Sequence, residues 1–334
     1  MVDISNQQYK ISLKDFKDMI ERVNKFILKK KREPAIVYVN PNNSTFYVNY
    51  QRFNDMLQRY KKFIRENNRE PNYISVLPPT TSTSKNLGFW IRGSDTKNID
   101  LSKLKSVACT DIFLGETAFN SNLIGNVIQK AKKQGIRVHG WIICLKKNGD
   151  WYSPTDTSNF NRVNNLASKM VNLGCSGIHL DYIRYPGTAY KYKDASTLIE
   201  NFIIDIHKNV KTIHGDVILS AAVMPEMEAN AYYYGQDYTK MGKWLDIIIP
   251  MAYKGNYREN TQWVGKVVKY IIEKSGKPVW AGLQTYRSDD DPTPIPESEL
   301  REDMQMVYSN GGSGCVLFRY GLTDPKLQVK DNGS

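Results

Sequence analysis

The 334-residue sequence is poor in the residues that build metal sites and covalent frameworks. It contains four histidines and four cysteines, and no two cysteines form a Cys-x-x-Cys pair. This pattern argues against a disulfide framework and a zinc site. The sequence also lacks an apolar run of the roughly 18 residues that a transmembrane helix requires. Its first residues, MVDISNQQYK, have no apolar core of a signal peptide.

The sequence does contain enough apolar residues for a sizeable core, together with an excess of positive charge. Apolar residues make up 41% of the chain, which excludes disorder as the overall class. There are 46 Lys and Arg against 34 Asp and Glu, a net charge of +12. Residues 1–80 hold 15 of these basic and 8 of the acidic residues, so they carry +7 and residues 81–334 carry +5. We therefore expect an anionic partner, bound mainly by the N-terminal segment.

The first 80 residues contain two copies of one pattern, separated by 37 positions without insertion. The recurring residues are Phe16, Met19, Arg22, Phe26, Ile27, Arg32, Glu33 and Pro34, which return as Phe53, Met56, Arg59, Phe63, Ile64, Arg69, Glu70 and Pro71. In each copy the apolar residues have helical spacing, and a short β-prone run follows the Arg-Glu-Pro turn. Ser12 and Asp15 have the spacing of a helix cap. Tandem copies of a small unit beside a larger domain indicate a binding module.

The segments ISLKDFKDMIERVNKFI and VNYQRFNDMLQRYKKFIRENNREPNYISV resemble the pseudomurein-binding repeat of proteins that attach to the cell wall of certain methanogenic archaea. The resemblance implies two wall-binding copies, at about 11–41 and 48–78, within a region 1–78. The first copy departs from the repeat pattern where KKKREPAIVYV replaces an asparagine- and glycine-rich turn. We expect that copy to bind differently or to be mainly structural. The composition of residues 79–85 indicates a linker.

From residue 86 onward, eight β-prone runs alternate with amphipathic helical segments. The runs are 86–92, 111–115, 137–145, 177–183, 216–223, 246–253, 278–286 and 314–320. The main helical segments are 120–134, 158–173, 195–213, 259–274 and 297–309, with shorter ones at 99–107 and 234–244. This alternation predicts an α/β fold, a (β/α)8 TIM barrel over residues 86–325, with a tail at 326–334. A doubly wound sheet is the alternative, but no glycine-rich phosphate loop follows an early strand.

The C-terminal ends of the strands, where such a barrel holds its active site, are rich in carboxylates, aromatic rings and arginines. A pair of carboxyl groups beside flat rings is the equipment of a glycosidase. The candidate catalytic residues are Asp181, Glu226 and Glu116. The candidate substrate-binding residues are Trp90, Arg92, Tyr182, Arg184, Tyr253, Tyr286 and Arg319. We expect neither a metal ion nor a cofactor.

The most specific motif is GIHLDYIRYP at 177–186, because an aspartate that closes an apolar strand belongs at the barrel mouth. Together with SAAVMPE and PMAYKG, it resembles a signature of TIM-barrel glycoside hydrolases. The resemblance implies that Asp181 is the nucleophile or transition-state stabiliser, and that Arg184 and Tyr185 hold the substrate or Asp181. The chitinase-like branch has Asp-x-Asp-x-Glu here, whereas this sequence has Ile183 at the glutamate position.

The general acid must therefore come from another strand. Glu226 is the first candidate because it follows the next strand along the chain, and Glu116 is the second. For each of them the structural alternative is a salt bridge in a loop. Asp289, Asp290 and Asp291 are interpreted first as a solvated acidic loop, and the alternative is that they contribute to the rim of the cleft.

These features predict a pseudomurein-directed glycosidase: the repeats hold the wall while the barrel hydrolyses its glycan backbone. The resemblance implies a uronic acid in that backbone, whose carboxylate would match Arg92, Arg184, Arg319 and Lys146. One alternative is an endoisopeptidase, which would need an exposed thiol beside a histidine. Another is a wall-binding protein with a degenerate barrel. No basic helix or aromatic-basic sheet face supports a nucleic-acid partner.

The start of the sequence also suggests where the protein acts. Because no signal peptide is evident, we expect the protein to be synthesised in the cytoplasm and to reach the archaeal cell wall after release, as an endolysin of a virus or provirus does. Export by a route that leaves no N-terminal mark is the alternative. We also expect the protein to be a monomer.

Overall fold

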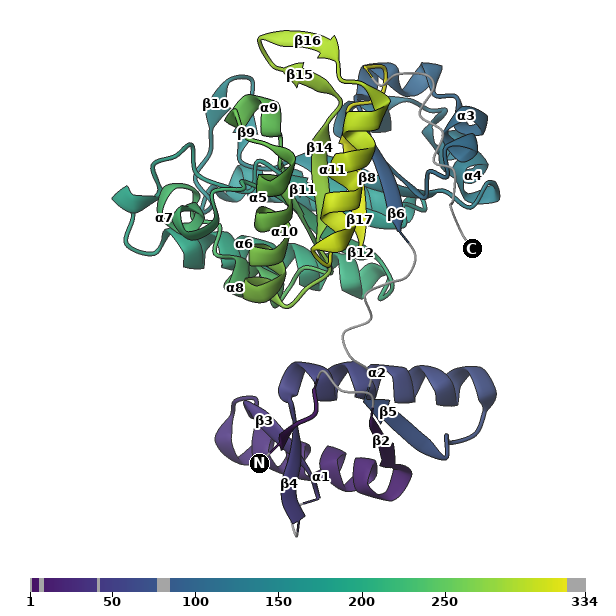
Figure 1. The fold of residues 1–334 in the computed structure, drawn as a ribbon, viewed down its shortest axis with the longest axis vertical. Helices are drawn as coiled ribbons and strands as arrows, with labels where there is room; N and C mark the ends of the chain where they lie inside the picture. Colours follow the sequence, from purple (N-terminus) through teal and green to yellow (C-terminus); the bar gives the residue numbers. More distant parts are fainter. Residues whose placement is uncertain (1, 6–8, 41–42, 77–84, 323–334) are drawn as a thin grey trace. The chain divides into compact units, whose positions relative to one another are not determined.

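The computed structural model (Figure 1) describes residues 2–5, 9–40, 43–76 and 85–322. The chain divides into two compact units, Met1–Thr81 and Ser82–Ser334. Nearly all of the predicted linker at 79–85, and the whole predicted tail at 326–334, lie outside the described residues.

Each repeat copy folds as a strand, a helix and a second strand. The first copy consists of β2 (Tyr9–Ser12), α1 (Leu13–Lys30) and β3 (Ile36–Asn40), and the second of β4 (Asn43–Asn49), α2 (Tyr50–Asn67) and β5 (Tyr73–Val76). The helix cap predicted at Ser12 is confirmed, because its side chain accepts a hydrogen bond from the backbone N–H of Asp15. Asn49, which was not predicted as a cap, accepts one from the backbone N–H of Arg52 in the same way. A short strand, β1 (Val2–Asp3), lies parallel to β4.

The strands pair between the two copies and not within them. β2 is antiparallel to β5, and β3 is antiparallel to β4. Ile11 of the first copy lies opposite Ile74 of the second. The residue equivalent to Ile11 in the second copy is Val48, and the residue equivalent to Ile74 in the first copy is Val37. These two also lie opposite each other. The copies are thus related by a pseudo-two-fold axis, and each supplies a strand to the other's sheet. The leading strands β2 and β4 were not among the predicted elements.

Eight parallel strands form the second unit. They are β6 (Asn86–Ile91), β7 (Asp111–Gly115), β8 (Arg137–Ile143), β11 (Gly177–Asp181), β12 (Ile218–Val223), β13 (Ile247–Pro250), β14 (Trp280–Gln284) and β17 (Gly314–Phe318). Their order is β13-β12-β11-β8-β7-β6-β17-β14, and parallel bridges from β13 to β14 close the sheet. The predicted (β/α)8 barrel is confirmed, and closure excludes the doubly wound alternative.

The helices of this unit cover the outside of the barrel (Figure 1). They are α3 (Leu101–Ser106), α4 (Ile124–Lys133), α5 (Thr157–Asn172), α6 (Ala195–Ile213), α7 (Asn230–Tyr234), α8 (Tyr238–Gly242), α9 (Lys254–Tyr257), α10 (Thr261–Ser275) and α11 (Glu297–Ser309). The short helix predicted at 234–244 corresponds to α8, which begins only after Gly235 has ended α7 in the left-handed region at φ 73°, and α7 itself was not predicted. None of the described helices is long and apolar enough to cross a membrane.

Two short strand pairs and four 3-10 turns complete the unit. The pair β9 (Lys146–Lys147) and β10 (Asp150–Trp151) follows β8, and the pair β15 (Tyr286–Ser288) and β16 (Asp291–Pro294) follows β14. The 3-10 turns are Gly93–Asn98, Glu116–Asn120, Ala189–Lys191 and Met227–Ala229. Both strand pairs therefore extend from the C-terminal end of the barrel, where they add side chains to its mouth.

Candidate active site

Asp181 is the last residue of β11 and lies buried at the mouth of the barrel. Its carboxylate accepts a hydrogen bond of 3.0 Å from the Trp141 indole and one of 2.6 Å from the backbone N–H of Tyr182. Tyr182 has a φ of 50°, which ends the strand. Burial raises the pKa of Asp181 above its ordinary value, although the two hydrogen bonds and the charge of Arg184 act in the opposite direction. A carboxyl group in this position can hold a proton that a solvated aspartate would lose.

Arg184 lies among aromatic rings beside Asp181. Its guanidinium is 4.9 Å from the ring centroid of Trp151, 5.0 Å from that of Tyr182 and 5.4 Å from that of Tyr234. The buried Nε of Arg184 has no hydrogen-bond partner among the described residues. The ammonium of Lys146 lies over the Trp151 and Tyr182 rings as well, at 5.5 and 5.2 Å. The mouth thus holds two cations packed on rings, a favourable setting for an anionic substrate group.

Glu226 lies in the loop after β12 and contacts Tyr234, one of the rings on which Arg184 packs. One carboxylate oxygen accepts hydrogen bonds from the hydroxyls of Tyr234 (3.0 Å) and Tyr257 (2.8 Å). The other is buried, with no hydrogen-bond partner in the described part of the chain. Burial and then the charge of Glu226 raise the pKa of Tyr234 to about 12, so this hydroxyl stays a donor. Because Arg184 packs on Tyr234 and acts on Asp181, the structure brings Asp181, Arg184 and Glu226 into one cluster.

Glu116, the third predicted carboxylate, has the loop salt bridge that was its structural alternative. Its Oε2 accepts a hydrogen bond from the backbone N–H of Ile143 (3.2 Å) and lies 3.4 Å from Arg162. Arg162 also donates to the carbonyls of Ile143 (2.6 Å) and Cys144 (3.1 Å). These bonds tie the end of β8 to α5. Since a carboxylate held in this way has a structural task, we remove Glu116 from the catalytic set.

Two of the predicted sugar-stacking rings are not available for stacking. Trp90 is only 2% exposed and packs inside the barrel against Phe113, Trp141 and Phe318. Tyr286 is 7% exposed, and its hydroxyl donates to Asp289. The prediction for these two is corrected because a buried ring has no face for a sugar.

Tyr182 and Tyr253 keep part of their surface exposed. Tyr253 stacks on Phe318 with ring centroids 5.5 Å apart. The Tyr182 ring is in contact with the cationic groups of Arg184 and Lys146. Both therefore remain candidates for contact with a substrate.

Arg92 and Arg319 form a second basic site at the barrel mouth. Arg319 lies 3.4 Å from Asp95, and burial together with the charge of Arg92 lowers the pKa of Arg319. Arg92 itself is exposed. Two guanidinium groups that repel each other are stabilised by an anion placed near both. This geometry is compatible with the substrate-binding role predicted for them.

Asp289 is a further mouth residue that the sequence did not distinguish from its acidic neighbours. It lies in the turn between β15 and β16 and accepts hydrogen bonds from the Tyr286 hydroxyl (2.8 Å) and the Asn256 amide (2.9 Å). Its charge, like that of Asp181, raises the pKa of Tyr253 after the larger effect of burial. Asp289 therefore faces the same mouth as Asp181. Its place after the seventh barrel strand was the available signal.

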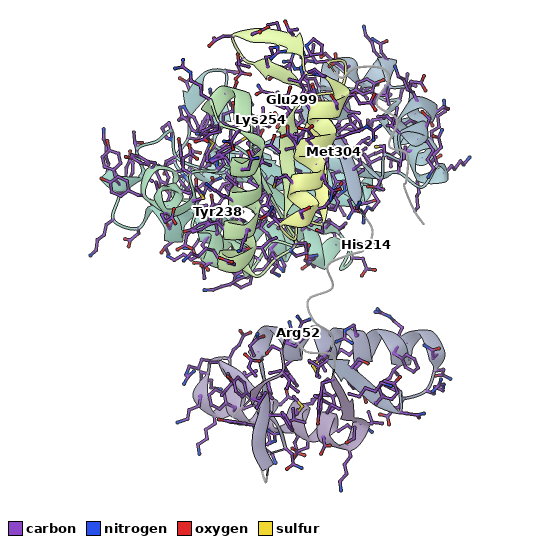
Figure 2. All side chains as sticks on the ribbon, in the orientation of Figure 1. Arg52, His214, Tyr238, Lys254, Glu299 and Met304 are labelled. Atoms are coloured by element: carbon purple, nitrogen blue, oxygen red, sulfur yellow. The ribbon has the colours of Figure 1, made fainter. Side chains whose placement is uncertain are left out.

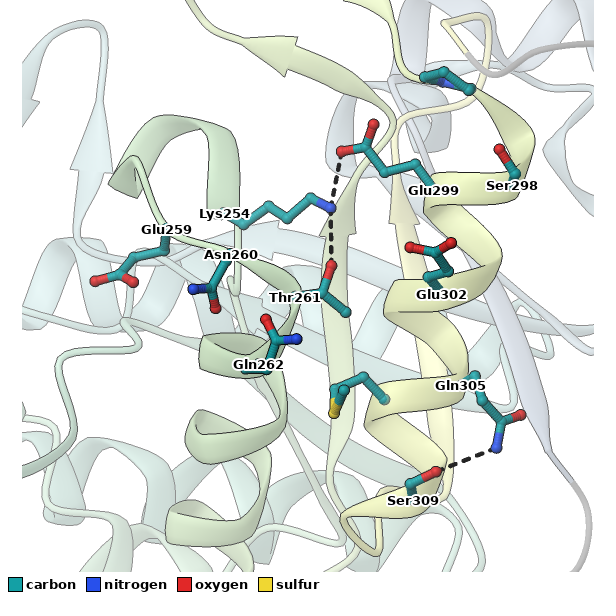
Figure 3. A pocket seen from close by; sticks show the side chains of 12 residues that line it. Lys254, Glu259, Asn260, Thr261, Gln262, Ser298, Glu299, Glu302, Gln305 and Ser309 are labelled. Atoms are coloured by element: carbon teal, nitrogen blue, oxygen red, sulfur yellow. Dashed lines mark hydrogen bonds and ion pairs between the residues drawn. The ribbon is translucent and has the colours of Figure 1, made fainter.

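Lys254, which follows Tyr253, turns away from these groups toward the outside of the barrel. Its ammonium lies 2.9 Å from Glu299 and 2.9 Å from Asp303 and donates to Thr261. These contacts join the start of α10 to α11 beside a surface hollow of about 800 Å³ (Figure 3). Lys254 and Glu299 approach each other there, above Met304 on α11 (Figure 2). The side chain of Lys254 thus fixes two outer helices and adds no charge to the mouth.

Two family models match the sequence. Residues 8–39 match the pseudomurein-binding repeat, and residues 120–273 match a putative glycosyl hydrolase domain. The chain carries a pseudomurein-binding repeat and a putative glycosyl hydrolase domain. The first match covers the first repeat copy, and the second copy is recognised by its 37-residue offset and its identical order of elements. The hydrolase match includes Asp181, Arg184 and Glu226.

Solved structures with the same fold as the hydrolase domain include a spore cortex-lytic enzyme and chitinases. The spore cortex-lytic enzyme SleL of Bacillus megaterium QM B1551 has a TM-score of 0.54 at 12% identity, over 82% of each chain. A class V chitinase from Pseudomonas fluorescens Pf-5 has a TM-score of 0.54 at 14% identity, over 72% of this chain and 96% of its own. A chitinase from Bacteroides thetaiotaomicron has a TM-score of 0.52 at 11% identity, over 74% of this chain and 96% of its own. No curated protein sequence matches significantly.

The cysteines of the hydrolase domain do not supply the nucleophile that a cysteine peptidase needs. All four, Cys109, Cys144, Cys175 and Cys315, are buried. Burial raises the pKa of each thiol, to about 12 for Cys109, Cys175 and Cys315. A catalytic thiol has the opposite properties, exposure and a lowered pKa. Within the described residues, no group of three His, Cys, Asp or Glu side chains could hold a metal ion.

Proposed function

We propose that the repeats attach this protein to pseudomurein and that the barrel hydrolyses the glycan backbone with two carboxyl groups. The observation that carries the proposal is the cluster of Asp181, Arg184 and Glu226 at the barrel mouth. Asp181 is a buried carboxyl group with a raised pKa. The Nε of Arg184 and the Oε2 of Glu226 are buried and have no hydrogen-bond partner among the described residues. Glycoside hydrolysis needs a proton donor and a second carboxylate of this kind.

The two carboxyl groups are suited to different steps. Burial favours the protonated form of Asp181, so we assign it the transfer of a proton to the glycosidic oxygen. The unpartnered oxygen of Glu226 then acts as the nucleophile or as the base that activates water, while Tyr234 and Tyr257 hold the other oxygen in place. This assignment replaces the nucleophilic role that the sequence resemblance implies for Asp181.

The surroundings of the pair support a substrate that is both polymeric and acidic. Tyr190 and Tyr232 are 50% and 58% exposed and stack with ring centroids 5.1 Å apart. Tyr233, 44% exposed, connects them to Tyr234 at 6.4 Å, and Tyr234 contacts Glu226. A glycan chain could stack along this run of rings on its way to the carboxylates. Arg184, Lys146, Arg92 and Arg319 would bind the carboxylates of uronic acid residues.

The test is the digestion of purified pseudomurein sacculi by the full-length protein, with the new chain ends identified. We expect new reducing sugar ends, and we expect Asp181→Asn to abolish them while the protein still sediments with the sacculi. New amino groups without reducing ends would indicate peptide cleavage instead. Full release of reducing ends by both Asp181→Asn and Glu226→Gln would refute the two-carboxylate mechanism.

A further inference from the structure

The second repeat copy contains a pocket of about 340 Å³ between α2 and β5. Its walls include Arg59, Tyr60, Phe63, Arg69, Asn72 and Tyr73. Tyr73 is 46% exposed, with Lys10 over its ring at 4.3 Å. The pocket therefore combines three aromatic rings, an amide and cationic side chains, the mixture of flat surface and polar groups that ligand sites use.

The framework of this pocket is present in both copies with nearly the same geometry. Arg69 lies 5.2 Å from the Phe63 ring, and Arg32 lies 5.3 Å from the Phe26 ring. Each of these arginines also donates to the carbonyl of the next residue at 3.4 Å. A second pair of equivalent arginines also makes the same contact in both copies. Arg59 donates to the carbonyl of Ser75 at 2.9 Å, and Arg22 donates to the carbonyl of Tyr38 at 2.7 Å. The shared residues thus belong to the fold of the repeat.

The side chains that give the pocket its polar and aromatic character occur in the second copy alone. At the positions equivalent to Tyr60, Asn72 and Tyr73, the first copy has Val23, Ala35 and Ile36. Ile36 is 38% exposed, so its position faces solvent in the same way as that of Tyr73. The first copy therefore presents alkyl groups where the second presents two phenols and an amide.

Glu70, which follows Arg69 in the chain, is already paired with other side chains. Glu70 lies 2.7 Å from Lys17 and accepts a hydrogen bond of 2.7 Å from the Tyr60 hydroxyl. Its carboxylate therefore does not cancel the charge of Arg69, which is exposed. An anionic ligand in the pocket would meet positive charge and rings.

We propose that the second copy carries the wall-binding site, and that its pocket takes a sugar residue bearing a carboxylate. The sugar ring would lie against Tyr73 and Tyr60, the carboxylate would pair with Arg69, and Asn72 would bind a hydroxyl group. The first copy would complete the sheets as a scaffold. This inference rests on the proposed binding of pseudomurein and locates it.

The repeat provides a matched pair of variants for the test. Arg69→Gln and Arg32→Gln remove the same charge, the same ring contact and the same backbone hydrogen bond from equivalent sites. Both are made in the full chain with Asp181→Asn, which prevents digestion, and binding is measured by sedimentation with pseudomurein sacculi. We expect Arg69→Gln to raise the Kd about tenfold, the loss of one charged hydrogen bond, and Arg32→Gln to change it less than about twofold.

A second variant tests the pocket without changing charge. Asn72→Ala/Tyr73→Ile introduces residues that the first copy accommodates at the same places, so it should fold, which circular dichroism checks. It should weaken binding to sacculi at least as much as Arg69→Gln. Oligogalacturonate, a soluble uronic acid polymer, should compete for the pocket, whereas neutral chitin oligomers should not.

The outcomes separate the pocket from the wider function. Equal losses for Arg69→Gln and Arg32→Gln would refute the pocket and indicate binding by net charge. Competition by poly-glutamate but not by oligogalacturonate would refute the sugar ligand. If the parent does not sediment with sacculi at all, the proposed wall binding itself fails, and the pocket proposal fails with it.

Discussion

The hydrogen bond from Trp141 to Asp181 allows the proton-donor assignment to be tested without removing the acid. Trp141→Phe leaves a ring in place but deletes the indole donor that lies 3.0 Å from the carboxylate. This donor stabilises the ionised form of Asp181. A hydrogen bond to a charged group contributes about 1.5 kcal/mol or more, which corresponds to about tenfold in the ionisation equilibrium. Asp181 should therefore stay protonated to a higher pH in Trp141→Phe than in the parent.

The assay is the rate of reducing-end release from sacculi as a function of pH. If Asp181 donates the proton, the rate falls on the alkaline side as Asp181 ionises, and Trp141→Phe moves that fall to higher pH. Trp90→Phe is the matched control, because the Trp90 ring lies 6.5 Å from the Trp141 ring between centroids, whereas Trp141 is the indole that donates to Asp181. An alkaline fall that stays in place in Trp141→Phe, or that moves equally in both variants, would refute the reasoning.

Four further outcomes follow from the same contacts. Asp181→Asn should be more stable than the parent at pH 7 in urea unfolding, because the pKa of Asp181 is raised in the folded parent, which therefore loses stability as pH rises and Asp181 ionises. The difference should shrink as pH falls through the raised pKa of the folded state and should be lost below the unfolded-state pKa of about 3.9. Glu116→Gln should keep the parent kcat but lower the free energy of unfolding by about 1 kcal/mol, because its contact with Arg162 is weakened. A large loss of kcat would return Glu116 to the catalytic set. Iodoacetamide should leave hydrolysis of sacculi unchanged because all four thiols are buried, whereas inactivation would favour the peptidase alternative. Tyr232→Ala should raise KM on sacculi several-fold and leave kcat on short soluble fragments unchanged, and equal effects on both substrates would contradict a role in holding polymer.

The regular parts of the fold could be predicted because their periodicity reflects burial. The helices α6 and α11 have the predicted bounds, and β7 does as well. Errors occur where a single backbone angle ends an element, as at Gly235 between α7 and α8 and at Tyr182 after β11. The leading strands of the repeats were missed for another reason. They pair with the other copy, and a four-residue strand such as β2 has too little local pattern to reveal a partner more than 60 residues away.

The candidate site was predicted only in part, because the sequence shows a residue's place along its strand but not its neighbours in the folded structure. Asp181 could be found because a charge at the end of an apolar strand breaks the pattern. Trp90 lies one residue before the end of β6 and Glu116 directly after β7, but their roles depend on neighbours in three dimensions: a packed interior for Trp90 and Arg162 for Glu116. Asp289 breaks no pattern, since it is one of three aspartates in a polar turn, and its contacts with Tyr286 and Asn256 come from the fold.

The internal repeat separates structural residues from functional ones more sharply than the barrel does. Where the two copies agree, as in Arg59 and Arg22, the residues make the same contact with the same strand position, so their identity follows from the shared fold. Where they differ, as in Tyr73 and Ile36, both side chains are exposed on the same framework, so the fold does not require either one. A difference that the fold does not require is the place to look for a ligand. The net charge of +7 in residues 1–80 is therefore an incomplete explanation of wall binding, because both copies share the arginines and only the second has the two tyrosines and the amide of its pocket.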